Sequence, residues 1–290
     1  MPLLGAHMSI AGGYYKAIDA AGALGMETCQ VFTKNNNQWR AKEISAAEAK
    51  QFAESLERFQ IRHPLSHASY LINLAAEADE LWQKSIAGMI VELQRAAALG
   101  IPYVVVHPGA GVKLTEEAAI AKVSQAINRV HELAGEVGSQ ILLENTAGQG
   151  TTLGRRFDQL AAIIAGVKHE DRVGVCIDTC HAFAAGYPLG TAIEYEALWH
   201  EFDTLLGRRR LKAMHLNDSK KPLGSRVDRH EHIGHGEMGL EPFRLLMNDS
   251  RMVATPMYLE TEKAENEDGE PWDAVNLRTL RELVVEPQTP

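Results

Sequence analysis

The chain has 290 residues and a formal net charge of -9, from 38 acidic and 29 basic side chains. This length fits one large α/β domain or two smaller ones, and 45% hydrophobic residues are enough for a large core. The acidic balance argues against a protein that holds nucleic acid through bulk positive charge alone, so such binding would need a local basic surface.

Eight apolar, strand-like runs alternate with helical segments along the chain. The runs cover residues 3–7, 28–32, 65–67, 103–107, 141–144, 173–178, 211–215 and 257–260. Helical patterns follow at 14–25, 45–60, 82–97, 115–137, 157–167, 194–206, from about 240, and at 274–284. Continuously apolar runs are typical of a parallel sheet buried on both faces. Eight such units predict an α/β fold of the (β/α)8 TIM barrel type, with a doubly wound sheet of fewer strands as the alternative.

The domain organisation is expected to be simple. No linker rich in Pro, Gly or Ser divides the chain, so residues 1–290 are predicted to form a single TIM-barrel domain with a short frayed tail at 286–290. Ser45 and Glu48 have the spacing of a capping box, which predicts that a helix begins there.

Cysteine usage and the N-terminus indicate the compartment. Cys29, Cys176 and Cys180 are an odd number without the spacing of a disulfide framework, so we expect buried thiols in a reducing environment. Residues 1–9 lack the basic and apolar regions of a signal peptide, and no apolar run is long enough to span a bilayer. We therefore expect a cytoplasmic protein without membrane contact.

Side chains that commonly bind metals end six of the predicted strands. In chain order they are His67, His107, Glu144, Asp178, His215 and Glu260. In a TIM barrel the C-terminal strand ends converge on one face, where active sites are built. Three more candidates are expected in the adjoining loops, namely His181, Asp228 and His230. Together these five histidines and four carboxylates suit Zn²⁺ or another first-row divalent ion, and they suffice for three ions, or two with fuller shells.

One glycine pattern is predicted to be accidental. Residues 234–239 formally match the G-x-G-x-x-G fingerprint of dinucleotide-binding proteins. That fingerprint requires a tight turn directly after a strand, whereas about twenty residues of loop separate these glycines from the preceding strand. We expect the glycines to turn the chain into the next helix.

Longer motifs follow one another in order between Leu4 and about Glu262. They are GAHMSIAGG, FTKNNNQWRA, HASYLINL, HPG, ENTAGQG, VGVCIDTCHAFAAGY, MHLNDSK and GSRVDRHEHIGHGEMG. Together they resemble the endonuclease IV family of apurinic/apyrimidinic endonucleases. The resemblance implies a zinc-dependent DNA repair endonuclease with a xylose-isomerase-like barrel. Such an enzyme cleaves the phosphodiester 5′ to an abasic site in duplex DNA and leaves a 3′-hydroxyl and a 5′-deoxyribose phosphate.

The resemblance also implies a role for each ligand, with three Zn²⁺ per chain. His67 and His107 would hold one zinc, which Glu144 would bridge to a second. The second zinc would also be held by Asp178, His215 and Glu260, and the third by His181, Asp228 and His230. Glu144 is the expected catalytic residue, because the pair that it bridges would carry the attacking hydroxide. We expect no organic cofactor, and a monomer.

The family's DNA-binding loops are expected after the second and third strands. Asn35, Asn37 and Trp39 lie in the first loop, while Tyr70 and Leu71 in the second would wedge open the stack at the lesion; ordinary loop packing is the alternative. Phosphate contacts are predicted at basic side chains, namely Lys34, Arg40, Lys220, Lys221, Arg226 and Arg229. Asn37 stands where we expect a basic residue, and it cannot supply a charge, which leaves open how the lesion is held.

Two other functions stay open at this level. A sugar isomerase or epimerase of the xylose-isomerase type would use the same barrel and strand-end ligands. It would need fewer histidines and no pair equivalent to Asp228 and His230. A non-catalytic lesion-binding protein would hold abasic DNA without turnover, and the complete ligand set argues against it.

Overall fold

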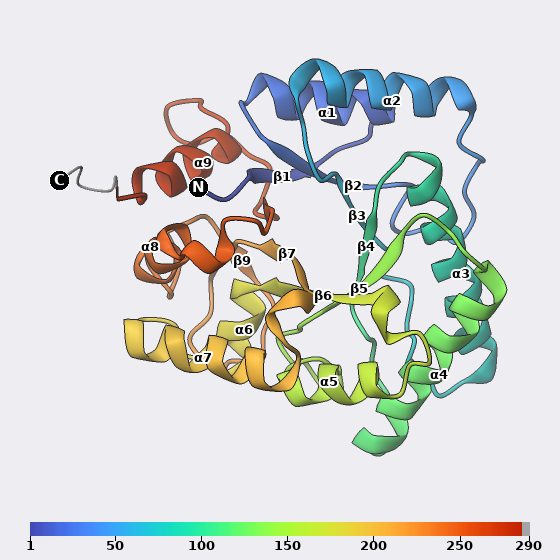
Figure 1. Ribbon diagram of the computed structural model, residues 1–290. Helices are drawn as coiled ribbons and strands as arrows, with labels where there is room; N and C mark the ends of the chain where they lie inside the picture. Colours follow the sequence, from blue (N-terminus) through green and yellow to red (C-terminus); the bar gives the residue numbers. More distant parts are fainter. Residues whose placement is uncertain (286–290) are drawn as a thin grey trace.

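Eight parallel strands close into a barrel in the order β1-β10-β7-β6-β5-β4-β3-β2 (Figure 1). The computed structural model describes residues 1–285, so the tail predicted at 286–290 lies outside the described residues. The strands are β1 (Leu4–Met8), β2 (Thr28–Phe32), β3 (Leu65–His67), β4 (Tyr103–Val106), β5 (Gln140–Glu144), β6 (Val173–Asp178), β7 (Leu211–His215) and β10 (Met257–Leu259). The ring closes where Leu4 of β1 pairs with Met257 of β10, which confirms the barrel and excludes the doubly wound alternative.

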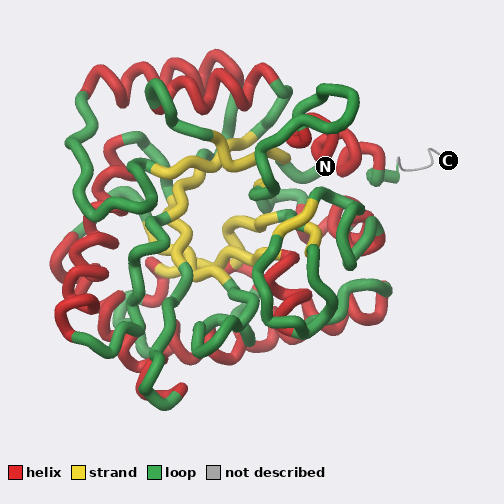
Figure 2. Tube along the Cα trace, turned by 180° about the vertical axis from the view of Figure 1, so that it is seen from behind, coloured by secondary structure: helices red, strands yellow, loops and turns green. Residues whose placement is uncertain are grey.

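Helices surround the ring of strands (Figure 2). They are α1 (Tyr14–Ala23), α2 (Ala46–Phe59), α3 (Asp79–Ala98), α4 (Glu116–Ala134), α5 (Phe157–Ala165), α7 (Ala192–Leu205), α8 (Glu241–Asn248) and α9 (Trp272–Glu282). The predicted capping box is confirmed, since the Ser45 hydroxyl accepts the Glu48 N–H and the Glu48 carboxylate accepts the Ser45 N–H. Among residues 1–285, none of these helices has both the length and the apolar character needed to cross a bilayer.

Several short elements were not predicted. They are the helix α6 (Thr179–Ala185), the hairpin of β8 (Asp218–Ser219) and β9 (His230–Glu231), and the 3-10 turns η1 (Glu170–Arg172), η2 (Arg208–Arg210) and η3 (Ser250–Met252). The helix and the 3-10 turns span about two turns or less, and each strand of the hairpin has two residues. Such elements are too short for a hydrophobic period to be recognised. The predictions that His181 and His230 lie in loops are therefore wrong, because His181 belongs to the first turn of α6 and His230 to β9, whereas Asp228 does lie in a loop.

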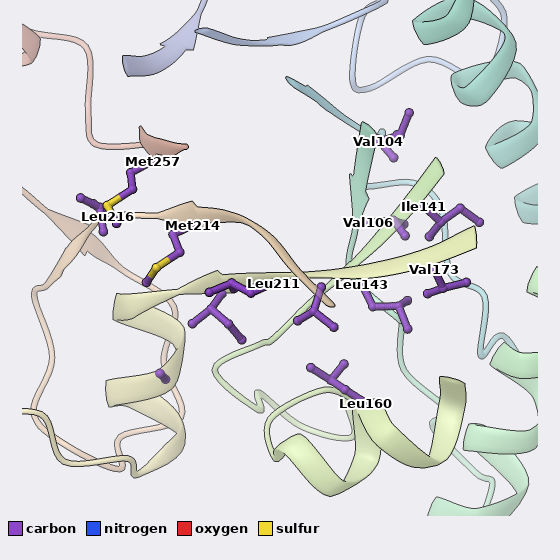
Figure 3. Packing of buried hydrophobic residues seen from close by; sticks show 14 of the residues in the cluster. Val104, Val106, Ile141, Leu143, Leu160, Val173, Leu211, Met214, Leu216 and Met257 are labelled. Carbon is purple, nitrogen blue, oxygen red and sulfur yellow. The ribbon is translucent and has the colours of Figure 1, made fainter. Parts of the chain in front are cut away.

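The alternation of side chains along each strand divides the core into two parts. On β4, Val104 and Val106 pack outward against the helix layer, together with residues such as Leu143 and Leu160 (Figure 3). Val105 belongs to a separate cluster with Leu65, Leu142, Cys176, Ala213 and Tyr258. The three cysteines are buried, as predicted. These two apolar parts hold the strand ends in place for the polar face of the barrel.

A buried histidine on α4 should make folding stability depend on pH. The Nδ1 atom of His131 has no hydrogen-bond partner among the described residues, and burial with the nearby Arg172 charge lowers the pKa of His131 to about 4. Between pH 6.5 and 4 the unfolded chain therefore binds a proton here that the folded chain does not. We expect this contribution to stability to be complete above pH 6.5 and to be lost as the pH falls toward 4.

The test is urea unfolding of the wild type and His131→Leu between pH 7 and 4, with a chelator present so that metal release does not differ between them. The difference in unfolding free energy between the two proteins should shift in favour of the variant as the pH falls. Parallel pH profiles would contradict the assignment.

Candidate metal centre

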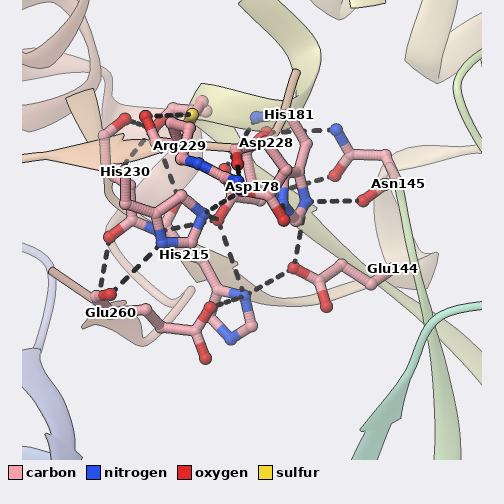
Figure 4. Close-up of polar contacts among 12 residues, drawn as sticks. Glu144, Asn145, Asp178, His181, His215, Asp228, Arg229, His230 and Glu260 are labelled. Carbon is pink, nitrogen blue, oxygen red and sulfur yellow. Dashed lines mark hydrogen bonds and ion pairs between the residues drawn. The ribbon is translucent and has the colours of Figure 1, made fainter. Parts of the chain in front are cut away.

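The C-terminal strand ends bring the predicted ligands together on one face of the barrel. His67, Glu144, Asp178 and His215 are the last residues of β3, β5, β6 and β7, while His107 and Glu260 come one residue after β4 and β10. Parallel pairing aligns these ends; for example, Asp178 lies in register with His215. In Figure 4 the side chains of Glu144, Asp178, His215 and Glu260 point toward one another, with His181, Asp228 and His230 beside them.

Glu144 lies at the centre of this cluster and is fully buried. Its Oε2 atom is 3.2 Å from Nε2 of His67 and 3.0 Å from Nε2 of His107. Its Oε1 atom is 2.8 Å from Nδ1 of His215 and 3.4 Å from Nδ1 of His181. One carboxylate thus contacts four imidazoles, as a bridging ligand would.

The ligand atoms form groups of a size that suits metal ions, since within each group they lie within 4.8 Å of one another. The groups are His67, His107 and Glu144; Glu144, Asp178, His215 and Glu260; Asp178, His181 and His230; and Cys180, Asp228 and His230. The first two coincide with the ligand sets that the resemblance implies. For the third set, Asp228 lies 3.1 Å from Nε2 of His181 and 3.2 Å from Nε2 of His230, so its three members are also in contact.

The electrostatics of the cluster fit a bound cation. Burial alone would lower the pKa of His181, but Asp178 and Asp228 raise it well above its ordinary value. Burial alone would raise the pKa of Glu144, but His215 and the other imidazoles hold it well below its ordinary value. Within residues 1–285, the buried Nε2 atoms of His181 and His230 lie at ion-pair distance from Asp228, but neither makes a hydrogen bond of good geometry. A divalent ion would supply the positive charge that the carboxylates require and would use these nitrogens.

A buried amide that the sequence did not identify fixes one of the ligands. Nε2 of Gln30 on β2 donates to the Glu260 carboxylate, which can only accept, so the orientation of the amide is determined. Its Oε1 atom must then accept the proton of His215 Nε2, at 2.7 Å. This leaves Nδ1 of His215 free for a metal. Nε2 of Gln30 also lies 2.9 Å from Nδ1 of His7, so His7 contacts the amide that orients the candidate ligands His215 and Glu260.

Two asparagines complete the support for Asp178. The Asn145 side chain accepts the N–H of Asp178 and donates to the carbonyl of Asp178. Nδ2 of Asn217 donates to Oδ2 of Asp178 at 2.6 Å. Oδ1 of Asn217 accepts the N–H of Glu260 at 2.8 Å, so Asn217 links two ligands. Their sequence signal is their position, because they follow Glu144 and His215 by one and two residues.

Asp218 of β8 anchors the segment that follows His230 and β9. Its buried carboxylate accepts the N–H groups of Gly234, Gly236 and Met238, each at 3.0 Å. A Cβ atom at Gly236 would lie 2.5 Å from Oδ1 of Asp218, so glycine is required there. The glycines that formally match a dinucleotide fingerprint therefore surround a carboxylate of their own chain.

The loops predicted to bind DNA lie beside the ligands. The Tyr70 ring is 58% exposed and lies against Phe32 and His67, with ring centroids 5.7 and 5.2 Å away. Asn35 and Asn37 are exposed, Leu71 is half-buried, and Asn37, Tyr70 and Glu260 line a pocket of about 670 Å³.

The remaining predicted DNA contacts differ in exposure. Lys220, Arg226 and Arg229 are exposed, and Nζ of Lys220 lies 3.7 Å from the Glu262 carboxylate. Trp39 packs over Gly88 of α3, so it anchors its loop to the protein. The side chain of Lys34, which was predicted to contact phosphate, is buried against Glu92 and also lines the pocket of about 670 Å³.

Comparisons with known proteins identify the family of the chain. A family model described as a xylose isomerase-like TIM barrel matches residues 18–283. A protein of Geobacter sulfurreducens named probable endonuclease 4 is 50% identical over 281 residues, which cover 97% of this chain and 94% of the relative. The chain belongs to the endonuclease IV family. The crystal structure of endonuclease IV from Thermus thermophilus matches with a TM-score of 0.85 and 38% identity, covering 97% of this chain and 98% of that chain.

Membership of the endonuclease IV family identifies the chain as a hydrolase, an endonuclease of nucleic acid. A D-psicose 3-epimerase from Clostridium cellulolyticum matches with a TM-score of 0.64 at 13% identity, over 97% of this chain and 91% of that chain. At that identity the likeness concerns the fold alone. The endonuclease IV relationship is thus favoured over the sugar isomerase alternative.

Proposed function

We propose that the chain is a zinc-dependent DNA repair enzyme that cleaves duplex DNA 5′ to an abasic site. The products would be a 3′-hydroxyl and a 5′-deoxyribose phosphate. The observation that carries the proposal is the convergence of nine candidate ligand side chains, with Glu144 at their centre, beside an exposed Tyr70. The names of the relatives support an endonuclease, and the exposed loops next to the cluster support a lesion in DNA as the substrate.

We assign three Zn²⁺ to the cluster. Zinc suits a mixture of imidazole and carboxylate ligands. Bound there, it would supply a water of lowered pKa and positive charge for the phosphate. The chain's own contribution is to hold Glu144 between two ligand groups, to fix His215 through Gln30, and to join Asp178 to Glu260 through Asn217.

We assign DNA recognition to the loops around the pocket of about 670 Å³ that Asn37, Tyr70 and Glu260 line. Asn35 and Asn37 would contact the opened duplex, and Tyr70 with Leu71 would fill the gap left by the missing base. Trp39 would act by holding the first loop against α3.

The phosphate contacts are assigned to exposed basic side chains on an otherwise acidic protein, namely Lys220, Arg226 and Arg229. We further propose a cytoplasmic monomer folded as one domain, since one chain supplies all nine candidate ligands.

The test is a gel assay on a duplex with a single tetrahydrofuran abasic analogue. One nick on the 5′ side of the analogue is expected, with a 3′ end that a polymerase extends, while the matched intact duplex stays uncut. Elemental analysis of the same protein should find close to three zinc per chain. Full activity with one metal or none would contradict the trinuclear assignment.

Replacing Gln30 by leucine is expected to weaken zinc binding by about 10- to 100-fold, the usual effect of removing a partner that orients a metal ligand. His215 would lose the acceptor of its Nε2 proton, and Glu260 would lose a donor. Competition against a chelator of known affinity measures the change. The control is Gln140→Leu, because Gln140 begins β5 at the end of the strand away from Glu144. Equal zinc affinities of the Gln30 and Gln140 variants would contradict the role of Gln30.

A further inference from the structure

A buried carboxylate on α3 contacts both loops to which DNA recognition is assigned. Glu92 is 1% exposed. Its Oε1 atom accepts the N–H of Ser69 at 3.1 Å and lies 3.2 Å from Nζ of Lys34. Its Oε2 atom accepts the hydroxyl of Thr33 at 3.0 Å. Thr33 and Lys34 begin the first loop, and Ser69 directly precedes Tyr70 in the second.

Two partners of Glu92, Lys34 and Ser69, make further hydrogen bonds to the backbone of the two loops. Nζ of Lys34 also donates to the carbonyl of Gln38 at 2.7 Å, so Lys34 connects the beginning of the first loop to its later part. The Ser69 hydroxyl donates to the carbonyl of Asn36 and accepts the N–H of Leu71 at 3.3 Å. The exposed side chains of Asn37 and Tyr70 are therefore presented by backbone that is tied, on both sides, to one carboxylate.

Burial makes this arrangement costly unless it is complete. A carboxylate and an ammonium removed from water are stable only when paired and hydrogen-bonded, and both Glu92 and Lys34 satisfy this condition. A change that separated the two loops would leave at least one of these groups without a partner. The two loops should therefore keep a fixed spacing rather than move independently.

We infer that Glu92 is a positioning residue that holds the two loops at a fixed spacing and thereby sets the discrimination between abasic and intact DNA. This inference rests on the proposed function. Glu92 lies outside the metal ligand groups, so its effect should be on recognition and not on the chemical step.

The main variant is Glu92→Leu combined with Lys34→Met, which removes both charges together and so avoids leaving one buried alone. We expect KM for the abasic duplex to rise and the ratio of affinities for abasic and intact duplex to fall by about tenfold, in the range of coupling between contacting groups. The value of kcat and the zinc content should stay unchanged. Glu92→Gln keeps an acceptor for the Ser69 N–H, so its ratio of affinities for abasic and intact duplex should fall less. This variant replaces the double variant if the double variant does not fold.

A double-mutant cycle separates positioning from a general loss of stability. Binding is measured for Asn37→Ala, Tyr70→Ala and their combination, in the wild type and in the Glu92→Leu/Lys34→Met background. The two substitutions should be energetically coupled in the wild type and independent in that background. Ser124→Ala, which loses a buried 2.8 Å hydrogen bond from α4 to the Ile163 carbonyl, is the stability control and should keep the coupling.

The outcomes are distinct. Unchanged discrimination and unchanged coupling in the Glu92 variants would overturn the inference alone. A parallel loss of zinc, kcat and affinity for every duplex would also overturn it, because that pattern indicates a structural role. A wild-type protein that leaves abasic duplex uncut overturns the proposed function, and the inference with it.

Discussion

Replacing Glu144 by alanine should reduce cleavage of abasic duplex by at least about 10³-fold, the upper range for removing one electrostatic group from an active site. The reason is that Glu144 contacts His67, His107, His181 and His215, so its loss separates the ligand groups that it joins. Single-turnover cleavage of the tetrahydrofuran duplex measures the effect.

Zinc content and duplex affinity separate this effect from unfolding. The Glu144→Ala protein should bind less zinc than the wild type and still bind abasic duplex, because within residues 1–285 no hydrogen bond or ion pair joins Glu144 to the loops that follow β2 and β3. Glu132→Ala, at an exposed position of α4, is the matched control and should cleave normally. A mild loss, similar for Glu144→Ala and the control, would show that Glu144 does not have the central role.

The barrel and the positions of most candidate ligands could be predicted because they depend on local patterns. Six ligands stand at or next to the ends of apolar runs, and the geometry of a parallel barrel brings such ends together regardless of their separation in sequence. Gln30 could not be found in this way. It is a single polar residue within an apolar strand, and its role follows from contacts with His215 and Glu260, which are far away in the chain.

Lys34 shows why exposure is difficult to predict. A lysine in a polar loop is normally solvated, and nothing near it in the sequence indicates otherwise. Its partner Glu92 lies on the helix that follows the next strand, in a segment whose apolar residues define the buried face. The packing of α3 against the two loops buries Glu92, and the buried carboxylate then pairs with Lys34. Neither position in the sequence indicates this packing.

Replacing Tyr70 and Leu71 together by alanine should lower discrimination between abasic and intact duplex by about 10- to 100-fold, since stacking on an aromatic side chain is worth about 1–3 kcal/mol per base. Tyr70 is exposed and its ring lies tilted against the His67 ring, where an opened duplex would meet it. Competition binding with the two duplexes, followed by zinc analysis, provides the measurement.

The zinc content of this double variant should equal that of the wild type, because neither residue belongs to a ligand group. Ile193→Ala, an exposed apolar side chain on α7, is the control for loss of surface hydrophobic area. If the double variant discriminates as well as Ile193→Ala, Tyr70 and Leu71 do not act as a wedge.

The hairpin of β8 and β9 contributes no strand to the eight-stranded ring, and Asp218 of β8 holds the segment that follows β9 through three N–H groups. Because the hairpin lies outside the ring, we expect it to open in a sub-global step that leaves the barrel folded. Asp228 and His230 would depart together in that step, while the other seven ligands stay on the ring and on α6. Amide exchange would then be faster in the hairpin than in the barrel strands. Assembly and disassembly of the site would proceed in stages, with a folded and partly equipped protein as the intermediate.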